Sequence, residues 1–190
     1  LRLVMDIGGG STELILGQGP EPRALESLHL GCVSMTERYF PGGDITREGF
    51  AGARKAAQLE LRPVKAFFRG VEDVEAIGTS GTIRATEAVA RQLGLSMAGL
   101  TPGIVEKLID KVLEFDNTAE LKINELSERR AQVWPGGLAI LVELLNVLKI
   151  ENLQVSEGAL REGLLYDLLG RLQHEDARER TVRAMMARYQ

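Results

Sequence analysis

Two carboxylates flank a turn rich in glycine and hydroxyl groups near the start of the chain. Asp6 precedes the segment Gly8–Thr12, and Glu13 follows it. Glycines have no Cβ atom, so we expect this backbone to turn sharply with positive φ and to approach a ligand closely. Successive amides in such a turn form a concave cluster of N–H donors that suits an anion. The pattern predicts a phosphate-binding loop made of Gly8, Gly9, Gly10, Ser11 and Thr12.

Two carboxylates and a bound anion are all negatively charged, so a further group is expected beside them. Magnesium binds through one or two carboxylates together with phosphate oxygens, and a carboxylate can also orient or deprotonate an attacking water. Asp6 and Glu13 therefore predict a cation, an activated water, or both, next to the phosphate. The alternative interpretation is a β-hairpin with polar turn residues, which the combination of three glycines, two hydroxyls and two carboxylates disfavours.

Length and composition narrow the class of protein. The chain has 190 residues, of which 44% are hydrophobic and 26% charged, as in one sizeable globular domain or a domain plus a fragment. The net charge of −4 gives no electrostatic basis for nucleic acid binding. No apolar run is long enough to span a bilayer, no signal peptide is visible, and the single cysteine, Cys32, excludes an internal disulfide. We expect a cytoplasmic protein, and the start within a strand without an initiator methionine predicts a fragment of a longer one.

Hydrophobic periodicity predicts an α/β fold. Strands are expected at about 3–7, 13–17, 24–30, 74–78 and 152–156. Helices are expected at about 34–40, 46–69, 83–93, 101–115, 118–122, 127–130, 138–148 and 160–172. The first of these helices has the spacing of a capping box at Ser34 and Glu37. Pro135 is expected to end a helix, because proline lacks the backbone N–H that a helix interior needs. Three meandering strands followed by two joined through helices give a five-stranded mixed sheet flanked by helices on both faces.

A second turn of small residues follows the strand predicted at 74–78. A strand, a glycine and hydroxyl turn and a helix N-terminus form a natural corner for an anion or a nucleotide. A plain connection between strand and helix is the alternative, because such turns are common in α/β proteins. The residues of this second candidate phosphate-binding turn are Gly78, Thr79, Ser80, Gly81 and Thr82.

Three motifs together resemble one protein family. They are Asp-Ile-Gly-Gly-Gly-Ser-Thr-Glu from Asp6, Gly-Thr-Ser-Gly-Thr from Gly78, and Val-Ser-Glu-Gly-Ala-Leu-Arg-Glu-Gly from Val155. In this order and near this spacing the chain resembles the exopolyphosphatase / guanosine pentaphosphate phosphatase (Ppx/GppA) family, within the actin and acetate-sugar kinase superfamily. The resemblance implies two ribonuclease H-like lobes around a cleft, with residues 1–172 as the second lobe. Residues 173–190 resemble the start of a C-terminal helical domain, truncated here.

The resemblance also implies roles for individual residues. Asp6 matches an aspartate that helps to hold Mg²⁺, and Glu13 matches a catalytic glutamate near the scissile phosphate and the attacking water. Gly8–Thr12 match the phosphate loop, and Gly78–Thr82 match a loop that lies near the adenosine in nucleotide-binding relatives. Glu157 and Arg161 fall in the motif that connects the lobes, where a structural role is as well supported as a chemical one.

The resemblance implies a phosphoanhydride hydrolase. The expected function is part of an exopolyphosphatase that releases orthophosphate from the end of inorganic polyphosphate with Mg²⁺, and the alternative substrate is guanosine pentaphosphate (pppGpp). The N-terminal lobe with the other phosphate loop is missing, so we expect the 190 residues alone to have little or no activity. Longer members are expected to form homodimers through parts outside this chain. A non-catalytic binding module and a kinase of the same superfamily remain as other classes, although two carboxylates beside the anion disfavour the first and no acceptor-binding motif supports the second.

Overall fold

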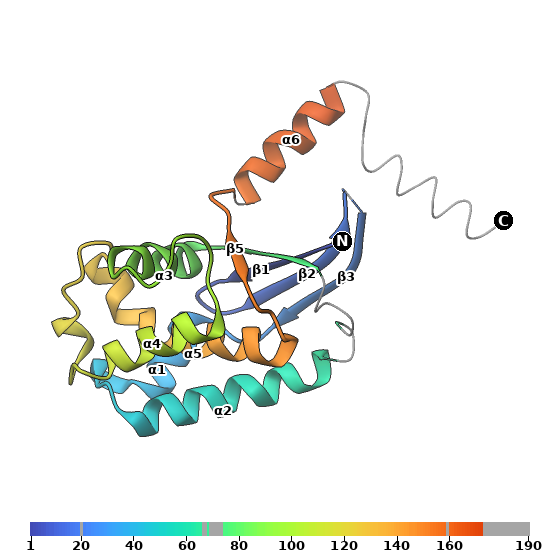
Figure 1. Cartoon of the computed structure of the whole chain (residues 1–190). Coiled ribbons are helices and arrows are strands. Elements are labelled where there is room, and N and C mark those ends of the chain that lie inside the picture. Colours follow the sequence, from blue (N-terminus) through green and yellow to red (C-terminus); the bar gives the residue numbers. More distant parts are fainter. Residues whose placement is uncertain (20, 66–67, 69–73, 159, 173–190) are drawn as a thin grey trace. The chain divides into compact units, whose positions relative to one another are not determined.

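The computed structural model describes residues 1–19, 21–65, 68, 74–158 and 160–172. Two compact units are present, Leu1–Ser156 and a second that begins at Glu157. The first unit contains the sheet, all of the candidate site and most of the helices (Figure 1). Of the second unit the structure describes the helix α6, Leu160–Leu172. The predicted start of a helical domain at 173–190 lies outside the described residues.

The first unit is built on a five-stranded mixed sheet of order β3-β2-β1-β4-β5. The strands are β1 (Arg2–Ile7), β2 (Thr12–Gln18), β3 (Glu21–Leu28), β4 (Glu75–Thr79) and β5 (Leu153–Val155). β1, β2 and β3 form an antiparallel meander, while β4 is parallel to β1 and β5 is parallel to β4. The predicted five strands and the mixed sheet are confirmed, and the parallel pairs are joined through helices as parallel strands require.

One face of the sheet is buried under helices. Because side chains alternate across a strand, Leu3 and Met5 of β1 share this face with Leu14 and Leu16 of β2, and all four are buried. In Figure 1, α1, α2 and α5 lie together along one side of the strands. This layer forms the main hydrophobic core of the unit.

The opposite face of the sheet is open within the first unit. Val4, Ile15, Leu25 and Ile77 line a shallow hollow of about 550 Å³ on this face, and Leu25 is 61% exposed. Among the described residues of Leu1–Ser156, the prediction of helices on both faces is therefore not met. The sequence pattern could not reveal the open face, because strands with alternating apolar residues also occur in sheets that are covered on one side only.

The described ranges contain six helices and two short 3₁₀ turns. The helices are α1 (Cys32–Tyr39), α2 (Arg47–Val64), α3 (Gly81–Gln92), α4 (Pro102–Val112), α5 (Glu128–Leu148) and α6, and the 3₁₀ turns are η1 (Pro41–Gly43) and η2 (Thr118–Glu120). Thr46, Thr101 and Ser127 cap their helices by accepting a hydrogen bond from a backbone N–H three residues on, as short oxygen-bearing side chains do at this position. The predicted capping box of α1 is wrong. The N-cap is Gly31, and the Ser34 hydroxyl donates to the Gly31 carbonyl.

The break predicted at Pro135 is also wrong, because α5 runs through it as one helix of 21 residues. The adjacent Gly136 is buried in close contact with α1, where a Cβ atom would lie 2.5 Å from the Thr36 hydroxyl. Thr36 also donates a hydrogen bond to the Val133 carbonyl of α5. The small residues thus allow two helices to pack tightly, and this tertiary contact outweighs the local preference for a helix end.

α5 is apolar enough, by length and composition alone, to resemble a membrane span. It is the one such helix among the described residues, and 78% of its most apolar window is buried inside the protein. Its central position explains this composition, because a helix that is surrounded by other elements is apolar on all sides.

A buried carboxylate on α5 ties three helices together. Glu143, 2% exposed, accepts hydrogen bonds from Arg54 (2.6 Å) and Gln58 (2.7 Å) of α2. Arg54 also forms a two-pronged contact with Glu106 of α4. Burial lowers the pKa of Arg54, but its hydrogen bonds to Glu143 and Glu106 outweigh this, and the pKa lies above its ordinary value. Because arginine then stays charged at any practical pH, this network adds no pH dependence to stability through Arg54.

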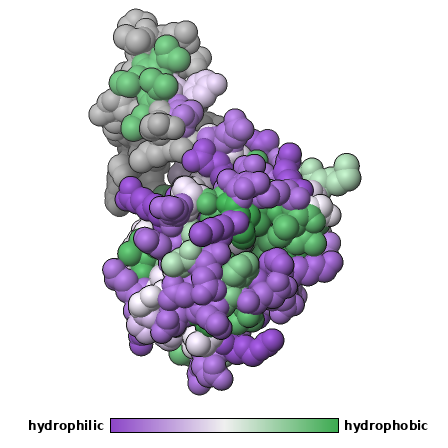
Figure 2. Space-filling view, turned by 90° about the vertical axis from the view of Figure 1, so that its left-hand side faces the viewer, coloured by the Kyte–Doolittle hydropathy of each residue, from purple (hydrophilic) through white to green (hydrophobic). Residues whose placement is uncertain are grey.

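Most of the apolar side chains of the first unit lie in this core, and the surface is more polar. On the face that Figure 2 presents, hydrophilic side chains predominate, with hydrophobic areas between them.

Candidate functional site

The glycine turn forms the tip of the hairpin between β1 and β2. The amide of Gly8 donates to the Ser11 carbonyl at 2.8 Å and closes the turn. The backbone N–H groups of Gly9, Gly10 and Ser11 donate to no acceptor among the described residues. The loop therefore offers three free amides to an anion. None of its three glycines has positive φ, so the prediction of that backbone conformation is wrong.

The loop is held from behind by the first turn of α1. The amides of Cys32 and Val33 donate to the carbonyls of Gly8 and Gly9, each at 2.9 Å. A Cβ atom at Gly31 would overlap the Gly9 carbonyl oxygen and the Gly10 backbone. Glycine at position 31 is thus required for the loop to lie this close to α1.

A row of four polar side chains crosses the sheet beside this loop. The strand register pairs Thr79 of β4 with Asp6 of β1, Asp6 with Glu13 of β2, and Glu13 with Ser27 of β3. The Thr79 hydroxyl donates to Oδ2 of Asp6 at 2.6 Å, and the Ser27 hydroxyl donates to Oε1 of Glu13 at 3.2 Å. Ser11 donates to the same Glu13 oxygen at 2.5 Å. The two carboxylates are therefore neighbours on one face and are each held by hydroxyl groups.

This row fits a bound cation. Like charges directly opposite each other across two strands are destabilising, yet neither Asp6 nor Glu13 forms an ion pair with a described residue. One oxygen of each, Oδ1 of Asp6 and Oε2 of Glu13, accepts no hydrogen bond within the described part of the chain. Two free carboxylate oxygens next to an anion cradle suit a hard divalent cation that completes its shell with phosphate and water. The described residues contain no group of three or more histidine, cysteine, aspartate or glutamate side chains that could hold a metal ion.

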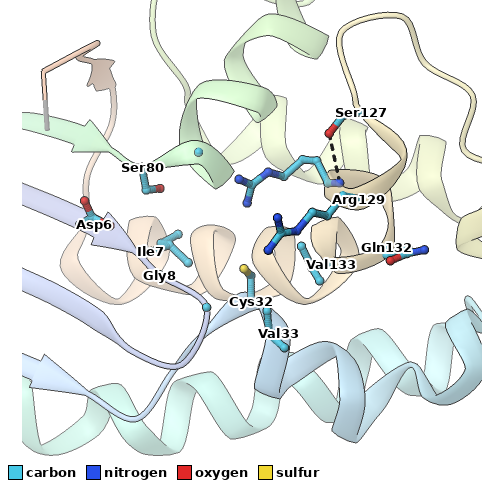
Figure 3. Close-up of a pocket in the computed structure, with 13 residues that line it drawn as sticks. Asp6, Ile7, Gly8, Cys32, Val33, Ser80, Ser127, Arg129, Gln132 and Val133 are labelled. Carbon is cyan, nitrogen blue, oxygen red and sulfur yellow. Dashed lines mark hydrogen bonds between the residues drawn. The ribbon is translucent and has the colours of Figure 1, made fainter.

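A cavity of about 600 Å³ opens next to the loop. Asp6, Gly8, Gly9, Ser80 and Gly81 line one side of it. The first turn of α5 supplies Arg129 and Arg130 to the lining, and in Figure 3 Arg129 extends from α5 into the cavity. The cavity thus has a negative end at the sheet and a positive wall at α5, as binding of a polyanion with its counterion requires.

Ser80 joins β4 to α3 in a strained conformation. Its φ is 94°, a region that residues other than glycine seldom adopt. The Ser80 hydroxyl accepts a hydrogen bond from the Ile83 amide and caps α3. Such strain costs about 1–3 kcal/mol and persists where the surrounding structure imposes it, often at functional sites.

Two of the predicted phosphate-binding residues, Thr12 and Thr82, have buried side chains that a phosphate cannot reach, and a third, Gly78, has no side chain to offer. Thr12 is fully buried, and its hydroxyl donates to the Leu30 carbonyl. Thr82 is also fully buried. A Cβ atom at Gly78, which lies within β4, would clash with Ile83 and Leu153. The expectation that Thr12 adds a hydroxyl donor for the anion is therefore corrected, since this threonine anchors the hairpin instead.

Sequence reasoning missed several residues of the site. The three motifs include neither Arg129 nor Arg130, although two arginines that follow a Ser N-cap must begin a helix together. Gly31 and Ser27 belong to none of the three motifs, and no sequence signal indicated them. Cys32 also belongs to none of the motifs, and it is 3% exposed and lines the cavity from the start of α1.

Comparison with known proteins agrees with this site. The model of the Ppx/GppA phosphatase family matches residues 1–172. Over 189 residues the chain is 36% identical to a guanosine-5'-triphosphate,3'-diphosphate pyrophosphatase of Aliivibrio fischeri and 39% identical to one of Vibrio cholerae. Each alignment includes 100% of this chain and 38% of the relative. A Ppx/GppA family member of Aquifex aeolicus superimposes with a TM-score of 0.76 at 29% identity, over 93% of this chain and 57% of that one. An exopolyphosphatase of Cytophaga hutchinsonii superimposes with a TM-score of 0.74 at 25% identity, over 89% and 57%.

These matches define the fold as the actin-like ATPase fold of the Ppx/GppA phosphatases. The chain belongs to the Ppx/GppA phosphatase family. It spans 38% of the length of the curated relatives it matches. Members of this family are phosphoanhydride hydrolases and generally depend on a divalent metal.

Proposed function

We propose that this chain is the second lobe of an enzyme that hydrolyses a terminal phosphoanhydride bond. The observation that carries the proposal is the pairing of Asp6 and Glu13 beside three free amides, since neither recognition alone nor packing requires two adjacent carboxylates next to an anion cradle. In this proposal residues 1–172 form the lobe, and 173–190 begin a further helical domain. The protein acts in the cytoplasm.

The reaction transfers the terminal phosphoryl group to water. The amides of Gly9, Gly10 and Ser11 bind its oxygens, and Arg129 and Arg130 neutralise charge on the phosphates that follow. Glu13 accepts a proton from the attacking water as the new P–O bond forms. The bond between the terminal phosphorus and the bridging oxygen breaks, and the bridging oxygen leaves with the shortened substrate while orthophosphate is released.

Asp6 is the residue proposed to hold Mg²⁺, and Glu13, its partner on the neighbouring strand, would share in holding the ion or orient a water. When bound, this ion would neutralise phosphate charge and polarise the bond to be broken. Thr79 fixes the other Asp6 oxygen, so the carboxylate presents a single orientation.

Two substrates fit this chemistry. Inorganic polyphosphate and pppGpp both end in the phosphoanhydride that the site would cleave. The relatives at 36% and 39% identity are named guanosine-5'-triphosphate,3'-diphosphate pyrophosphatase, whereas the solved exopolyphosphatase is 25% identical. The higher identities favour pppGpp as the preferred substrate, and polyphosphate is the second candidate.

A direct assay tests the proposal. The chain joined to a family first lobe is incubated with Mg²⁺ and either pppGpp or polyphosphate, and orthophosphate is measured. We expect release from both, faster from pppGpp, and little or none from the 190 residues alone, because charge neutralisation from the facing lobe is absent. Binding of either substrate without release by the two-lobed protein would instead support a non-catalytic binding module.

Changing Asp6 to Asn should separate metal binding from folding. In a metal chelator we expect the free energy of unfolding of Asp6→Asn to rise by about 0.5 kcal/mol, because a like-charge pair across two strands is removed. Mg²⁺ should raise the Tm of the unchanged chain, since a ligand that binds the native state stabilises it, and should leave the Tm of the variant unmoved. Asp110→Asn, at an exposed position of α4, is the matched control. An equal Mg²⁺ response in all three chains would contradict the assignment.

A further inference from the structure

The second glycine and hydroxyl turn contacts an arginine. Arg130 donates from Nη1 to the Thr82 hydroxyl at 3.3 Å. A Cβ atom at Gly81 would overlap Nη2 of Arg130 and lie 3.0 Å from its Cζ. The guanidinium therefore lies directly on the backbone of the first turn of α3, at the wall of the cavity.

A second contact one helical turn further along fixes the two helices against each other. Trp134, four residues after Arg130 on α5, donates from its indole to the Thr86 hydroxyl at 3.0 Å. Thr86, four residues after Thr82 on α3, in turn donates to the Thr82 carbonyl at 2.8 Å. Residues four apart lie on one face of a helix, so the two contacts form parallel rungs between α5 and α3. The inner rung is buried, since Trp134 is 1% exposed.

We propose that Gly81 and Thr82 are positioning residues that aim the guanidinium of Arg130 at the substrate phosphates. This inference rests on the proposed function. It gives the turn Gly78–Thr82 a second role: the turn orients Arg130, in addition to any contact that its own backbone makes with the phosphates. Gly81 gives the guanidinium room, Thr82 sets its angle, and the Trp134–Thr86 rung keeps the helices in register. Arginine gains most from such fixing, because its planar fork binds phosphate oxygens in a defined geometry.

Arg129 provides the contrast. It lines the same cavity from the same helical turn, is exposed, and its side chain forms no hydrogen bond or ion pair with another described residue. Arg129 contributes charge without a fixed geometry, and changes at Gly81 or Thr82 should not alter its contribution.

The test is calorimetric titration of the full chain with inorganic tripolyphosphate at constant ionic strength. We expect Arg130→Ala and Gly81→Ala each to weaken binding by about 10-fold, since the loss of one charge-assisted contact has this size. Interacting sites are not additive, so the double variant should bind no more weakly than Arg130→Ala alone. Combined with Arg129→Ala, Gly81→Ala should keep its full effect.

A pair of variants at Thr82 covers the case in which Gly81→Ala does not fold. Thr82→Val keeps the shape and removes the hydroxyl, and should weaken binding about 3-fold, whereas Thr82→Ser should bind like the unchanged chain. Additive effects of Gly81→Ala and Arg130→Ala, or normal binding by Thr82→Val, would overturn the positioning role while phosphate binding stands. If the unchanged chain binds no tripolyphosphate, the proposed function fails and the role of Gly81 and Thr82 fails with it.

Discussion

Replacing Glu13 by Gln should lower the rate of phosphate release from pppGpp and from polyphosphate at least 100-fold in the two-lobed protein. A carboxamide has the size of the carboxylate and can still accept the hydrogen bonds that Ser11 and Ser27 donate. It cannot take a proton from the attacking water, and positioned general bases contribute about 10²–10⁴ in rate. The loss should fall on kcat, because the amides and arginines that bind the phosphates are unchanged.

Binding distinguishes this loss from a damaged site. The affinity of Glu13→Gln for tripolyphosphate should be retained or increased, because a negative charge beside the anion is removed. Glu21→Gln makes the same change at an exposed position that begins β3, and it should leave both rate and affinity unaltered. If Glu13→Gln keeps more than a tenth of kcat, the proton acceptor must be another group, and Glu13 would then serve only the cation.

The contiguous part of the site could be predicted from the sequence. Asp6, the three glycines and Glu13 lie within eight residues, so any hairpin brings them together. The five strands were predictable for a similar reason, because alternating apolar residues mark each one locally. The family resemblance added the role of each motif, but it did not show how the motifs meet.

The partners of these residues come from far along the chain. Thr79 reaches Asp6 across 73 positions, and Ser27 reaches Glu13 only because β2 and β3 pair in one register. A shift of one residue would turn every side chain to the other face, and no local pattern fixes that register. Arg130 meets Thr82 through the packing of α5 on α3, whereas the close packing of α5 on α1 carries α5 through Pro135. Tertiary contacts therefore explain both why the sequence did not reveal these site residues and why the predicted helix break at Pro135 is wrong.

Changing Gly31 to Ala should remove phosphate binding although residue 31 contacts no phosphate in the proposed mechanism. The added Cβ atom would overlap backbone atoms of Gly9 and Gly10, and backbone cannot move aside as the end of a long side chain can. The loop must then withdraw from α1 and lose the hydrogen bonds that Cys32 and Val33 donate to it. We expect the free energy of unfolding to fall by about 2–3 kcal/mol, as for overpacked interiors, and tripolyphosphate affinity to fall more than 10-fold.

Gly103→Ala separates this effect from the general cost of replacing a glycine. Residue 103 lies in the first turn of α4, and the nearest atom to an added Cβ is 4.0 Å away. Alanine is the better helix former by up to about 1 kcal/mol, so this control should be neutral or stabilised in urea denaturation and should bind tripolyphosphate normally. A Gly31→Ala chain that is destabilised yet binds normally would show that the three free amides keep their geometry without α1. Loss of binding in a chain that remains folded would show that the contact at Gly31 sets the shape of the phosphate loop, since the loop's own sequence is unchanged.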